Sequence, residues 1–598
     1  TTIRTIRDTD GDNRLEFAPG EAHEYQGSGE PPPVEGSILN FLQLSDFQVA
    51  DEESPGRVEF VDETQQPPLT PFGAAYRPQE SLGPHYIEAM VRQARNTVSP
   101  ITHEQLDLAL LTGDNADSQQ YNETRWFIDI LDGQKKIDPN SGREGICDPT
   151  PNALYDGVRN GGREQGYYEP DASEGGEDGR GYTPDRAENF ATTGRDVTVR
   201  DFPGLFEAAQ HRFEAIGLDM PWYSAFGNHD ALVQGNSPSA YFGPEGPSGE
   251  TSNPAYQGIA TGCLKPSKLP GGSGSLFDAF GDPGQIPGTA PLTVPPDERR
   301  CYLAKDEPPP AGGAPAPCSS GGWIQQHFLS TGQPAGHGFA NRPPTAVVNN
   351  DGYYAFTPRQ GLRFAVLDSV TDDCGSEVPL CSEGSIDHTQ FEWLRGEIEA
   401  AAARGDYVIT FAHHTLRTTR SPNGDPTEEP VHYGEAVDRR DGQPQPPSPG
   451  ETLEQLFCEN PNVLAHVAGH EHQNFVERHE CEQDQPPTPG AGDFWEVSTA
   501  SHIDWPQQSR MIELIDNAGT DMSLAVTMLD HDGPPDPGNA PAFPIARGAS
   551  GEQVLKLASI GREIAYNDYQ GSRGAIGASV SDRNAILPLE QPWPYGSE

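Results

Sequence analysis

The stretch Phe226-Gly227-Asn228-His229-Asp230 ends a short apolar run, residues 221–226, that we expect to form a strand. A glycine closes the run, and three polar side chains occupy the turn beyond it. In open α/β sheets, turns at the carboxyl ends of strands carry the chemistry. Asn228 offers an amide oxygen to a metal, His229 can transfer a proton near neutral pH, and Asp230 can orient the imidazole. The stretch therefore predicts a functional site at a strand end.

Four other apolar runs end in the same way, with polar residues that can bind a metal. We expect these runs to be strands over residues 38–44, 106–111, 407–411 and 463–467. The turns beyond them read Ser45-Asp46-Phe47-Gln48, Thr112-Gly113-Asp114-Asn115, Ala412-His413-His414-Thr415 and Gly469-His470-Glu471-His472. Together with the first stretch they supply the candidate ligands Asp46, Gln48, Asp114, Asn228, His413, His470 and His472.

Segments with helical periodicity lie between the predicted strands. We expect helices over residues 83–96, 121–131, 203–216, 390–403, 453–457 and 553–564. Further strands are expected over 362–367, 494–499, 511–515 and 524–529, the last two as an antiparallel pair. The repeated order of strand, polar turn and helix is typical of an α/β sheet, so we expect an α/β fold.

The candidate ligands comprise three histidines, two carboxylates and two amides. This mixture of nitrogen and oxygen donors suits Mn²⁺, Fe or Zn²⁺ better than Ca²⁺. Seven ligands are too many for one small transition metal, but they suit two ions about 3.5–4 Å apart that share one carboxylate. The sequence thus predicts two divalent or trivalent metal ions as cofactors.

The five turns, read in order as DxQ, GDN, GNHD, HH and GHEH, resemble the calcineurin-like metallophosphoesterase superfamily. The pattern of that superfamily is DxH, GDxx, GNHD/E, xH and GHxH, and the resemblance covers roughly residues 39–530. Three longer stretches look like a branch of secreted actinobacterial metallophosphoesterases. They are RVEF at 57–60, GDNADSQQYNETRW from Gly113, and TASHIDWPQQSR at 499–510.

This resemblance implies a four-layer α/β/β/α sandwich with long Pro/Gly-rich insertions, and hydrolysis of a phosphate mono- or diester. It implies that Asp114 bridges two metals. One site would be completed by Asp46, Gln48 and His472, and the other by Asn228, His413 and His470. A bridging hydroxide would attack phosphorus in line. His229, with Asp230 beside it, would donate a proton to the leaving oxygen or stabilise the phosphoryl charge.

Gln48 departs from the superfamily pattern, which has a histidine at this position. An amide oxygen is a neutral and weaker ligand. We therefore expect the ion held by Asp46, Gln48 and His472 to bind less tightly, or to be a harder ion. The competing hypothesis is a phosphoesterase scaffold with weak or no activity that acts as an extracellular structural or binding protein.

Three further polar residues are candidates for substrate contact or for support of the ligands. Asn115 follows Asp114 and is expected to brace its loop. His502 follows the predicted strand 494–499, and His337 lies in a glycine-rich loop that could cover a pocket. For both histidines the competing interpretation is an ordinary hydrogen-bonded or exposed side chain.

The chain divides by composition into a central domain and two extensions. We expect a metallophosphoesterase domain over residues 37–532, with insertions at about 133–200, 231–350 and 418–450, and a C-terminal extension over 533–598 packed on it. In the N-terminal extension, residues 1–36, acidic side chains alternate as in a calcium loop: Asp8, Asp10, Asp12 and Glu16. Pro19 stands where an EF-hand has its closing glutamate, so a solvated acidic turn is the competing interpretation.

The charge balance is strongly acidic, with 39 Lys and Arg against 90 Asp and Glu and a formal net charge of −51. Such a surface argues against nucleic acid or anionic membrane as partners. It is typical of a protein kept soluble in high salt, although an arginine-biased genome would also reduce the number of lysines. No apolar run in the sequence is long enough to span a bilayer.

Eight cysteines without a CxxC pair favour disulfides in an exported protein. We expect the pairs Cys374–Cys381 and Cys458–Cys481, and leave the pairing of Cys147, Cys263, Cys301 and Cys318 open. The sequence starts at Thr1 without a methionine, as after removal of an export signal or in a trimmed chain. We therefore expect a secreted or extracellular protein.

Overall fold

The computed structural model describes residues 1–52, 54, 77–141, 200, 202, 205–236, 301–306, 321–370, 382–422, 430–438, 442–445, 447–481, 492–518, 521–538, 551–568, 577–589 and 591–593. Within these ranges the chain is an α/β protein with two large mixed sheets, one of seven strands and one of six.

The seven-stranded sheet is built around β4 (Gly36–Leu44), whose second half is fully buried. β5 (Leu108–Leu111) and β8 (Trp222–Ser224) continue the sheet in parallel on one side of β4. On the other side β17 (Gln508–Asp516), β18 (Met522–Asp530) and β19 (Ala585–Leu589) follow in antiparallel order, and β3 (Glu24–Tyr25) lies at the edge, parallel to β19. Both terminal segments thus contribute a strand to this sheet.

The six-stranded sheet has the order β15-β16-β14-β11-β10-β9. Its central strands are parallel: β10 (Leu362–Val366), β11 (Tyr407–Phe411), β14 (Val463–Ala468) and β16 (Phe494–Ser498). The edge strands β9 (Tyr354–Arg359) and β15 (Phe475–His479) are antiparallel to them. The runs of apolar residues in β11 and β14 are buried along almost their whole length, as expected for parallel strands covered on both faces.

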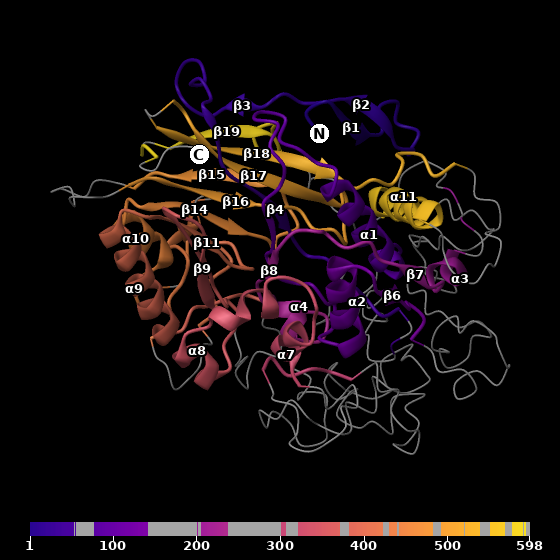
Figure 1. Ribbon diagram of the computed structural model, residues 1–598, viewed down its shortest axis with the longest axis horizontal. Helices are drawn as coiled ribbons and strands as arrows, with labels where there is room; N and C mark the ends of the chain where they lie inside the picture. The colour runs from indigo at the N-terminus through magenta and orange to yellow at the C-terminus, as the bar shows by residue number, and fades with distance from the viewer. Residues whose placement is uncertain are drawn as a thin grey trace.

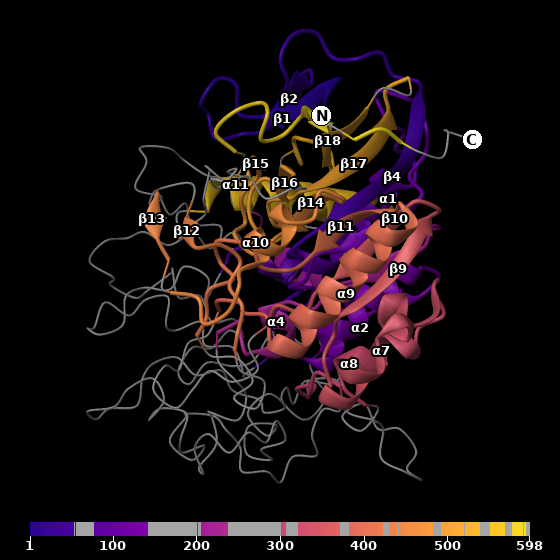
Figure 2. The same ribbon diagram turned by 90° about the vertical axis from the view of Figure 1, so that its left-hand side faces the viewer.

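The two sheets contact each other through aromatic side chains. Phe41 of β4 packs edge-on against Phe364 of β10 and Phe411 of β11, with ring centroids 5.3 and 5.8 Å apart. The core of the seven-stranded sheet includes α1 (Gly83–Ala94), α2 (Tyr121–Asp132) and α11 (Gly551–Asn567). A separate core joins the six-stranded sheet to α9 (His388–Arg404) and α10 (Leu453–Cys458). Figure 1 shows these two groups of helices on opposite sides of the molecule, and α9 and α10 face the viewer in Figure 2.

Local sequence signals explain several helix ends. A proline, Pro84, lies in the first turn of α1, where its missing N–H is not needed. Asp387 caps α9 by accepting a hydrogen bond from the Gln390 backbone N–H, and Gly405 ends this helix with φ of +79°. Thr452 forms a capping box with Gln455 at the start of α10.

The predicted helix over residues 203–216 is too long. Among the described residues of this range only Leu205–Ala209 is helical (α3), and Phe213–Glu214 forms β7, which pairs with β6 (Lys136–Ile137). The strand pairing overrides the helical periodicity of this segment. The remaining short elements are β1 (Arg4–Arg7), β2 (Glu16–Pro19), η2 (Glu80–Leu82), α4 (Asn228–Ala231), α7 (Trp323–Phe328), η6 (Ala335–Asn341), α8 (Pro344–Asn349), β12 (Val437–Asp438) and β13 (Gln443–Pro444).

Among the helices in the described ranges, none combines the length and the apolar character needed to cross a membrane.

Candidate metal centre

The five predicted turns meet at one edge of the structure, beyond the carboxyl ends of β4, β5, β8, β11 and β14. Backbone hydrogen bonds join the first two turns, from Asp46 N to Gly113 O at 3.1 Å and from Gln48 N to Asp114 O at 2.8 Å. Ligand atoms of Asp46, Asp114 and His413 lie within 4.8 Å of one another, and all three residues are buried. Side chains that are far apart in the sequence therefore share one small space.

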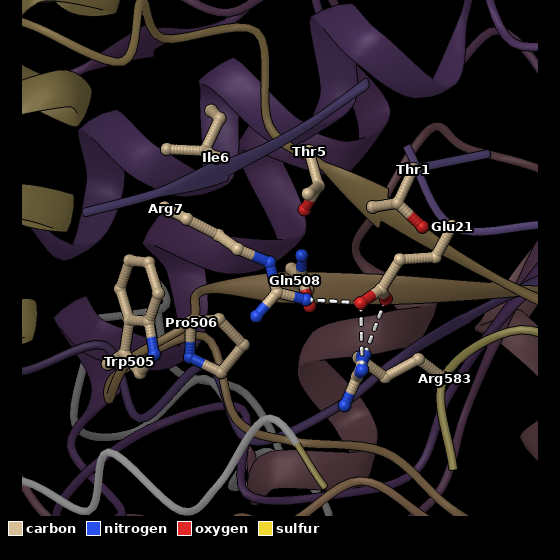
Figure 3. Close-up of a pocket in the computed structure, with 9 residues that line it drawn as sticks. All are labelled: Thr1, Thr5, Ile6, Arg7, Glu21, Trp505, Pro506, Gln508 and Arg583. Carbon is tan, nitrogen blue, oxygen red and sulfur yellow. Dashed lines mark hydrogen bonds and ion pairs between the residues drawn. The ribbon is translucent and has the colours of Figure 1, made fainter. Parts of the chain in front are cut away.

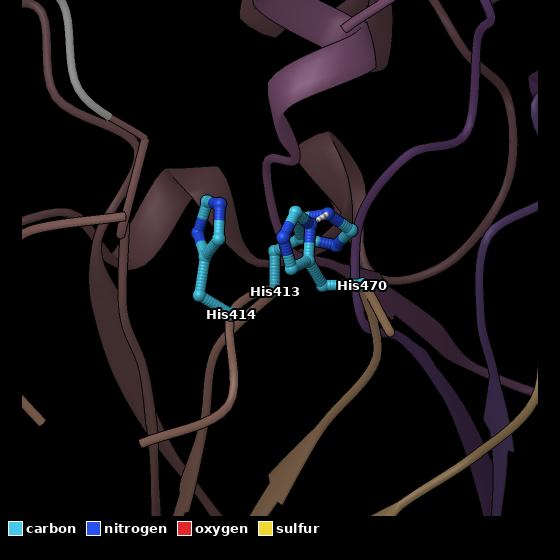
Figure 4. Close-up of side chains that lie close together, drawn as sticks. All are labelled: His413, His414 and His470. Atoms are coloured by element: carbon cyan, nitrogen blue, oxygen red, sulfur yellow. Dashed lines mark hydrogen bonds between the residues drawn. The ribbon is translucent and has the colours of Figure 1, made fainter. Parts of the chain in front are cut away.

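His413, Asn228 and His470 form one half of this site. His413 Nε2 lies 2.8 Å from Asn228 Oδ1 and 3.2 Å from His470 Nδ1, and the latter atom lies 3.1 Å from the same amide oxygen. Figure 4 shows the rings of His413 and His470 together, with His414 beside them. Both ring nitrogens of His414 are engaged elsewhere, by the Ser369 hydroxyl and the Ser382 carbonyl, so His414 supports the loop.

The hydrogen bonding of His413 shows that this half fits a cation. Its Nδ1 donates to the Thr112 carbonyl at 2.9 Å, so Nε2 of the neutral ring carries a lone pair. This lone pair faces two acceptors, Asp114 Oδ2 at 3.2 Å and Asn228 Oδ1 at 2.8 Å. Burial lowers the pKa of His413, but the charge of Asp114 outweighs burial and raises this pKa to about 9. The cluster therefore needs a positive charge, which a proton or a metal ion can supply.

Asp46, Gln48 and His472 form the other half. His472 Nε2 lies 3.4 Å from Asp46 Oδ1 and 3.1 Å from Gln48 Nε2. The Gln48 amide nitrogen also donates to Asp114 Oδ2 at 3.1 Å, whereas its oxygen, Oε1, is buried and has no hydrogen-bond partner among the residues that the structure describes. Rotation of this amide would turn the unused oxygen toward the other ligand atoms. The residues of this half also fit a cation, with Gln48 as the weakest of the donors.

Most of the candidate ligands lie on strained backbone. The φ angle is +51° at Asp46, +40° at Gln48, +53° at Asp114, +68° at His470 and +54° at His472. Such values cost on the order of 1–3 kcal/mol for a residue other than glycine, and they persist where the surrounding structure imposes them. The tight turns direct these side chains into one space, and this clustering of strain supports a functional role.

His229 lies next to the Asp114 carboxylate. Its backbone N–H donates to Asp114 Oδ1 at 2.8 Å, and its Nε2 lies 3.8 Å from Asp114 Oδ2. Its Nδ1 lies 2.8 Å from the backbone carbonyl of Asp117 and 3.5 Å from Oδ1 of that residue. Burial lowers the pKa of His229, but Asp114 and then Asp117 outweigh burial and raise this pKa. The imidazole is thus held with one nitrogen toward the ligand cluster.

The expectation that Asp230 orients His229 needs correction. The Asp230 carboxylate instead accepts hydrogen bonds from the backbone N–H groups of Gly227, Asn115 and Ala116, at 3.1, 3.1 and 2.9 Å. Burial and the charge of Asp114 raise the pKa of Asp230 to about 7. Asp230 therefore joins two ligand-bearing turns. The carboxylate that faces the His229 ring is that of Asp117, three residues after Asp114.

Of the three supporting candidates, Asn115 and His502 lie next to the candidate ligands, whereas His337 does not. Asn115 braces the site, since its side-chain N–H group donates to the Ala225 carbonyl and to Asp230. His502 lies behind Asp46, with its ring nitrogens 2.9 Å from the Ser45 carbonyl and 2.9 Å from the Ser509 hydroxyl.

His337 is not part of the centre, which corrects its assignment to the substrate pocket. Its ring stacks on Trp222, with centroids 3.4 Å apart, and is fully buried. Its nitrogens lie near the Trp222 carbonyl, the Ser330 hydroxyl and Asp132, none of which is a candidate ligand. A histidine in a glycine-rich loop is here a core residue.

Two residues that sequence reasoning missed face the histidines of the site. Asp117 faces His229, and Asp504 Oδ2 lies 2.6 Å from His472 Nδ1. Burial raises the pKa of Asp504, but the charge of Arg77 outweighs it and lowers this pKa to about 2. The available signals were the acidic residues inside the stretches GDNAD and SHIDW.

The N-terminal acidic loop has part of the predicted geometry. Carboxylate oxygens of Asp8, Asp10 and Asp12 lie within 4.8 Å of one another. Glu16 instead accepts a hydrogen bond from the Thr9 hydroxyl, and backbone N–H groups donate to Asp8 and Asp12. Calcium binding at this loop stays a prediction.

A small pocket near β1 is separate from the centre (Figure 3). Arg7 and Arg583 both project into it, and both form ion pairs with Glu21, at 2.6 and 2.7 Å. The pocket contains none of the candidate ligands, and its Arg7, Arg583 and Glu21 charges pair with one another, so we do not assign substrate binding to it.

The predicted disulfide Cys458–Cys481 is confirmed, with the two Cα atoms 5.4 Å apart. It ties the end of α10 to the residues after β15. Cys301 is also disulfide-bonded, and its partner lies outside the described residues. The expected pair Cys374–Cys381, and Cys147, Cys263 and Cys318, lie outside the described residues as well.

Similarity to known proteins is found among solved structures. No protein family model and no curated protein matches the chain. Among solved structures, the chain is similar to a dimetal phosphatase from Danio rerio, with 11% sequence identity and a TM-score of 0.30. The match covers 82% of this chain and 96% of that one. At this identity and TM-score the likeness carries no argument about the reaction.

Proposed function

We propose that the protein is a metal-dependent phosphoesterase that hydrolyses a phosphate mono- or diester. One observation carries the proposal: donor atoms from five separate turns converge on the shared carboxylate of Asp114. His413 Nε2 and Gln48 Nε2 lie 3.2 and 3.1 Å from Asp114 Oδ2, and a carboxylate oxygen of Asp46 lies within 4.8 Å of ligand atoms of both Asp114 and His413. A set of three histidines, two carboxylates and two amides is suited to a pair of Mn, Fe or Zn ions.

The two halves of the site would hold one ion each. Asn228, His413 and His470 would hold one, Asp46, Gln48 and His472 the other, and Asp114 would be shared. Two ions in such a site lower the pKa of water and neutralise charge on a phosphoryl group. The protein itself provides a mostly buried site in which these ligands are already oriented by their turns.

His229 is the residue that we assign to proton transfer. Its Nδ1 lies near the carbonyl and carboxylate of Asp117, which fixes the ring, and its Nε2 faces the side of the cluster where Asp114 lies. A proton held on Nε2 could pass to the leaving oxygen of a bound ester. The ring could also stabilise the negative charge of the phosphoryl group.

The proposal also covers the fold, the cellular location and the substrate class of the protein. Two packed mixed sheets with helices against each support a four-layer α/β/β/α sandwich of the metallophosphoesterase kind, with the long Pro/Gly-rich segments as insertions. The Cys458–Cys481 disulfide supports a location outside the cytoplasm, because such bonds form in oxidising compartments. The net charge of −51 disfavours nucleic acid as substrate.

A direct test is turnover of a chromogenic phosphomonoester and a chromogenic phosphodiester by the purified protein with added Mn²⁺. We expect hydrolysis of at least one of them, and a loss of about 10²- to 10⁴-fold in His229→Ala. His103→Ala is the matched control, since this exposed histidine lies outside the site. No turnover above background on either substrate, with metal bound, would contradict the proposal.

The alternative is a scaffold in which the metals serve stability and no reaction occurs. Gln48 favours it, because this residue places an N–H group, and not a ligand atom, among the other ligands. The same assay separates the two functions, since a scaffold would bind metal and gain stability from it without turnover.

A further inference from the structure

A buried carboxylate lies directly behind one of the candidate metal ligands. Asp504 Oδ2 is 2.6 Å from His472 Nδ1, on the side of the ring opposite the ligand cluster. The other ring nitrogen, Nε2, faces Asp46 Oδ1 at 3.4 Å and the Gln48 amide at 3.1 Å. With a carboxylate as acceptor, Nδ1 carries the hydrogen, and Nε2 presents its lone pair to the site.

Asp504 is itself held by several donors. Its other oxygen, Oδ1, lies 2.8 Å from Arg77 Nε and 3.4 Å from the Gln79 amide nitrogen, which also donates to the Ile503 carbonyl at 3.1 Å. Only 7% of the Arg77 side chain and 13% of the Asp504 side chain are exposed. A charge pair this buried restricts the position of the carboxylate, and so of His472.

The loop that carries Asp504 is anchored by its neighbour Trp505. This indole is buried in a small core with Ile6 and Leu15 from the N-terminal segment and Ala565 from α11. Tyr566 packs edge-on against it at 4.8 Å between ring centroids. Both terminal segments therefore support the loop behind His472.

The two halves of the site differ in how their histidines are held. His413 donates to a neutral backbone carbonyl, that of Thr112, at 2.9 Å. His472 donates to a charged carboxylate that is paired with an arginine. A carboxylate behind an imidazole makes it a more basic and better oriented ligand. Of these two histidines, the one with the stronger hydrogen bond behind its ring, His472, therefore lies in the half that contains the weak amide ligand Gln48.

We propose that Asp504, held by Arg77, is a positioning residue for His472 that sustains metal binding in the Gln48 half of the site. It fixes the ring orientation and the Nδ1–H tautomer, and thereby strengthens the half of the site in which the neutral amide of Gln48 is the weakest donor. This inference rests on the proposed function, because it requires that the site binds two ions.

The test measures metal binding and not activity. Metal-free wild-type protein, Asp504→Ala and Asp504→Asn are titrated with Mn²⁺ by isothermal titration calorimetry, and bound metal per chain is measured by mass spectrometry after gel filtration. EPR distinguishes an isolated Mn²⁺ from a coupled pair. Asp132→Asn is the matched control, since Asp132 is a buried carboxylate 3.4 Å from His337, which is outside the site.

We expect wild-type protein and Asp132→Asn to bind two ions. In Asp504→Ala the affinity for one ion should fall by about 10- to 100-fold, with the other unchanged, and EPR should show isolated Mn²⁺. Asp504→Asn should fall between them, because its amide oxygen still accepts from Nδ1–H. Circular dichroism identifies any variant that does not fold, and Asp504→Asn decides the question if the alanine variant is lost.

Two results would overturn the inference, and they differ in what else they affect. If Asp504→Ala and Asp504→Asn bind both ions with wild-type affinity, Asp504 does not position His472, while the proposed function stands. If wild-type protein itself binds no Mn²⁺ or other transition metal, the proposed function fails and the inference fails with it. An equal loss of both ions in the folded variants would also overturn it, because it would show a general structural role.

Discussion

Replacement of Gly227 by alanine tests how closely the turns that carry the candidate metal ligands are packed. A Cβ atom at this position would lie 2.1 Å from Asp114 N and 2.3 Å from Asp114 Oδ1. The backbone of Gly227, with φ of −116° and ψ of 170°, is one that any residue can adopt. The glycine is therefore required by the close approach of the two turns and not by its own conformation.

The size of the effect follows from these distances. Ordinary van der Waals contact needs at least 3.4 Å, so Asp114 and Gly227 must separate by more than 1 Å to accept a methyl group. Asp114 also accepts from the His229 N–H and faces His413 and Gln48, so its displacement moves both halves of the site. A misplacement of about 1 Å can cost about 100-fold in rate, and overpacking costs roughly 1–3 kcal/mol in stability.

The assay combines turnover, metal content and thermal unfolding of Gly227→Ala. We expect at least a 100-fold loss of activity, weaker binding of both ions and a lower Tm. Gly396→Ala in α9 is the matched control, because a Cβ atom there meets open space. This control should keep full activity and gain up to about 1 kcal/mol of stability, since alanine favours helix over glycine. Wild-type turnover and two bound ions in Gly227→Ala would refute the described packing of Asp114.

Four further predictions can be tested on the same protein. Gln48→His replaces the weak amide ligand by an imidazole. In calorimetry this variant should bind one of the two Mn²⁺ ions more tightly and the other with unchanged affinity. Equal changes in both affinities would contradict the assignment of Gln48 to one half of the site. Asp117→Asn should lower kcat by about 10-fold or more, with little change in bound metal, because this residue holds His229 and no ion. In His479, burial lowers the pKa but hydrogen bonds to Glu454 and Glu496 outweigh it and raise this pKa to about 9. The stabilising effect of His479 is thus complete below a pH of about 6.5 and is lost as the pH rises through about 9. Chemical denaturation should therefore show His479→Gln to be about 3 kcal/mol less stable than wild type near pH 6, and much closer to wild type near pH 10. A stability difference that does not vary with pH would contradict this prediction. Finally, the Tm of the wild-type protein should rise from low to molar NaCl as salt screens the repulsion of a net charge of −51, and a flat or falling curve would leave the acidity without that explanation.

The position of the site could be predicted from the sequence because strand ends carry a clear signal. Apolar runs that form β4, β5, β8, β11 and β14 each end at polar residues, and parallel neighbours bring these ends to the same edge. The residue types at the turns then indicated a metal. Neither step needs knowledge of the side-chain directions.

The partners of individual side chains could not be predicted in this way. In tight turns with positive φ, such as those at Asp46 and Asp114, the direction of a side chain depends on φ and ψ and not on spacing. Asp230 follows His229 in the sequence, but its carboxylate turns back to the backbone of residues 115 and 116. Asp117 and Asp504 reach the histidines from other loops.

Contacts between distant segments, which bury a loop or add a strand, were the other feature that the sequence did not indicate. A glycine-rich segment around His337 suggests an exposed loop, yet the ring stacks on Trp222 in the core. The periodicity of residues 203–216 suggests one helix, yet β7 forms there because β6 offers a partner strand. Both differences arise from tertiary contacts between segments that are distant in the sequence.

The most direct measurement is anomalous diffraction from crystals of the protein grown with Mn²⁺. We predict two anomalous peaks about 3.5–4 Å apart on either side of the Asp114 carboxylate, one next to His413 and His470 and the other next to Asp46 and His472. No peak beside Asp114, or anomalous density only at the acidic loop of residues 8–12, would contradict the assignment of this cluster as a metal centre.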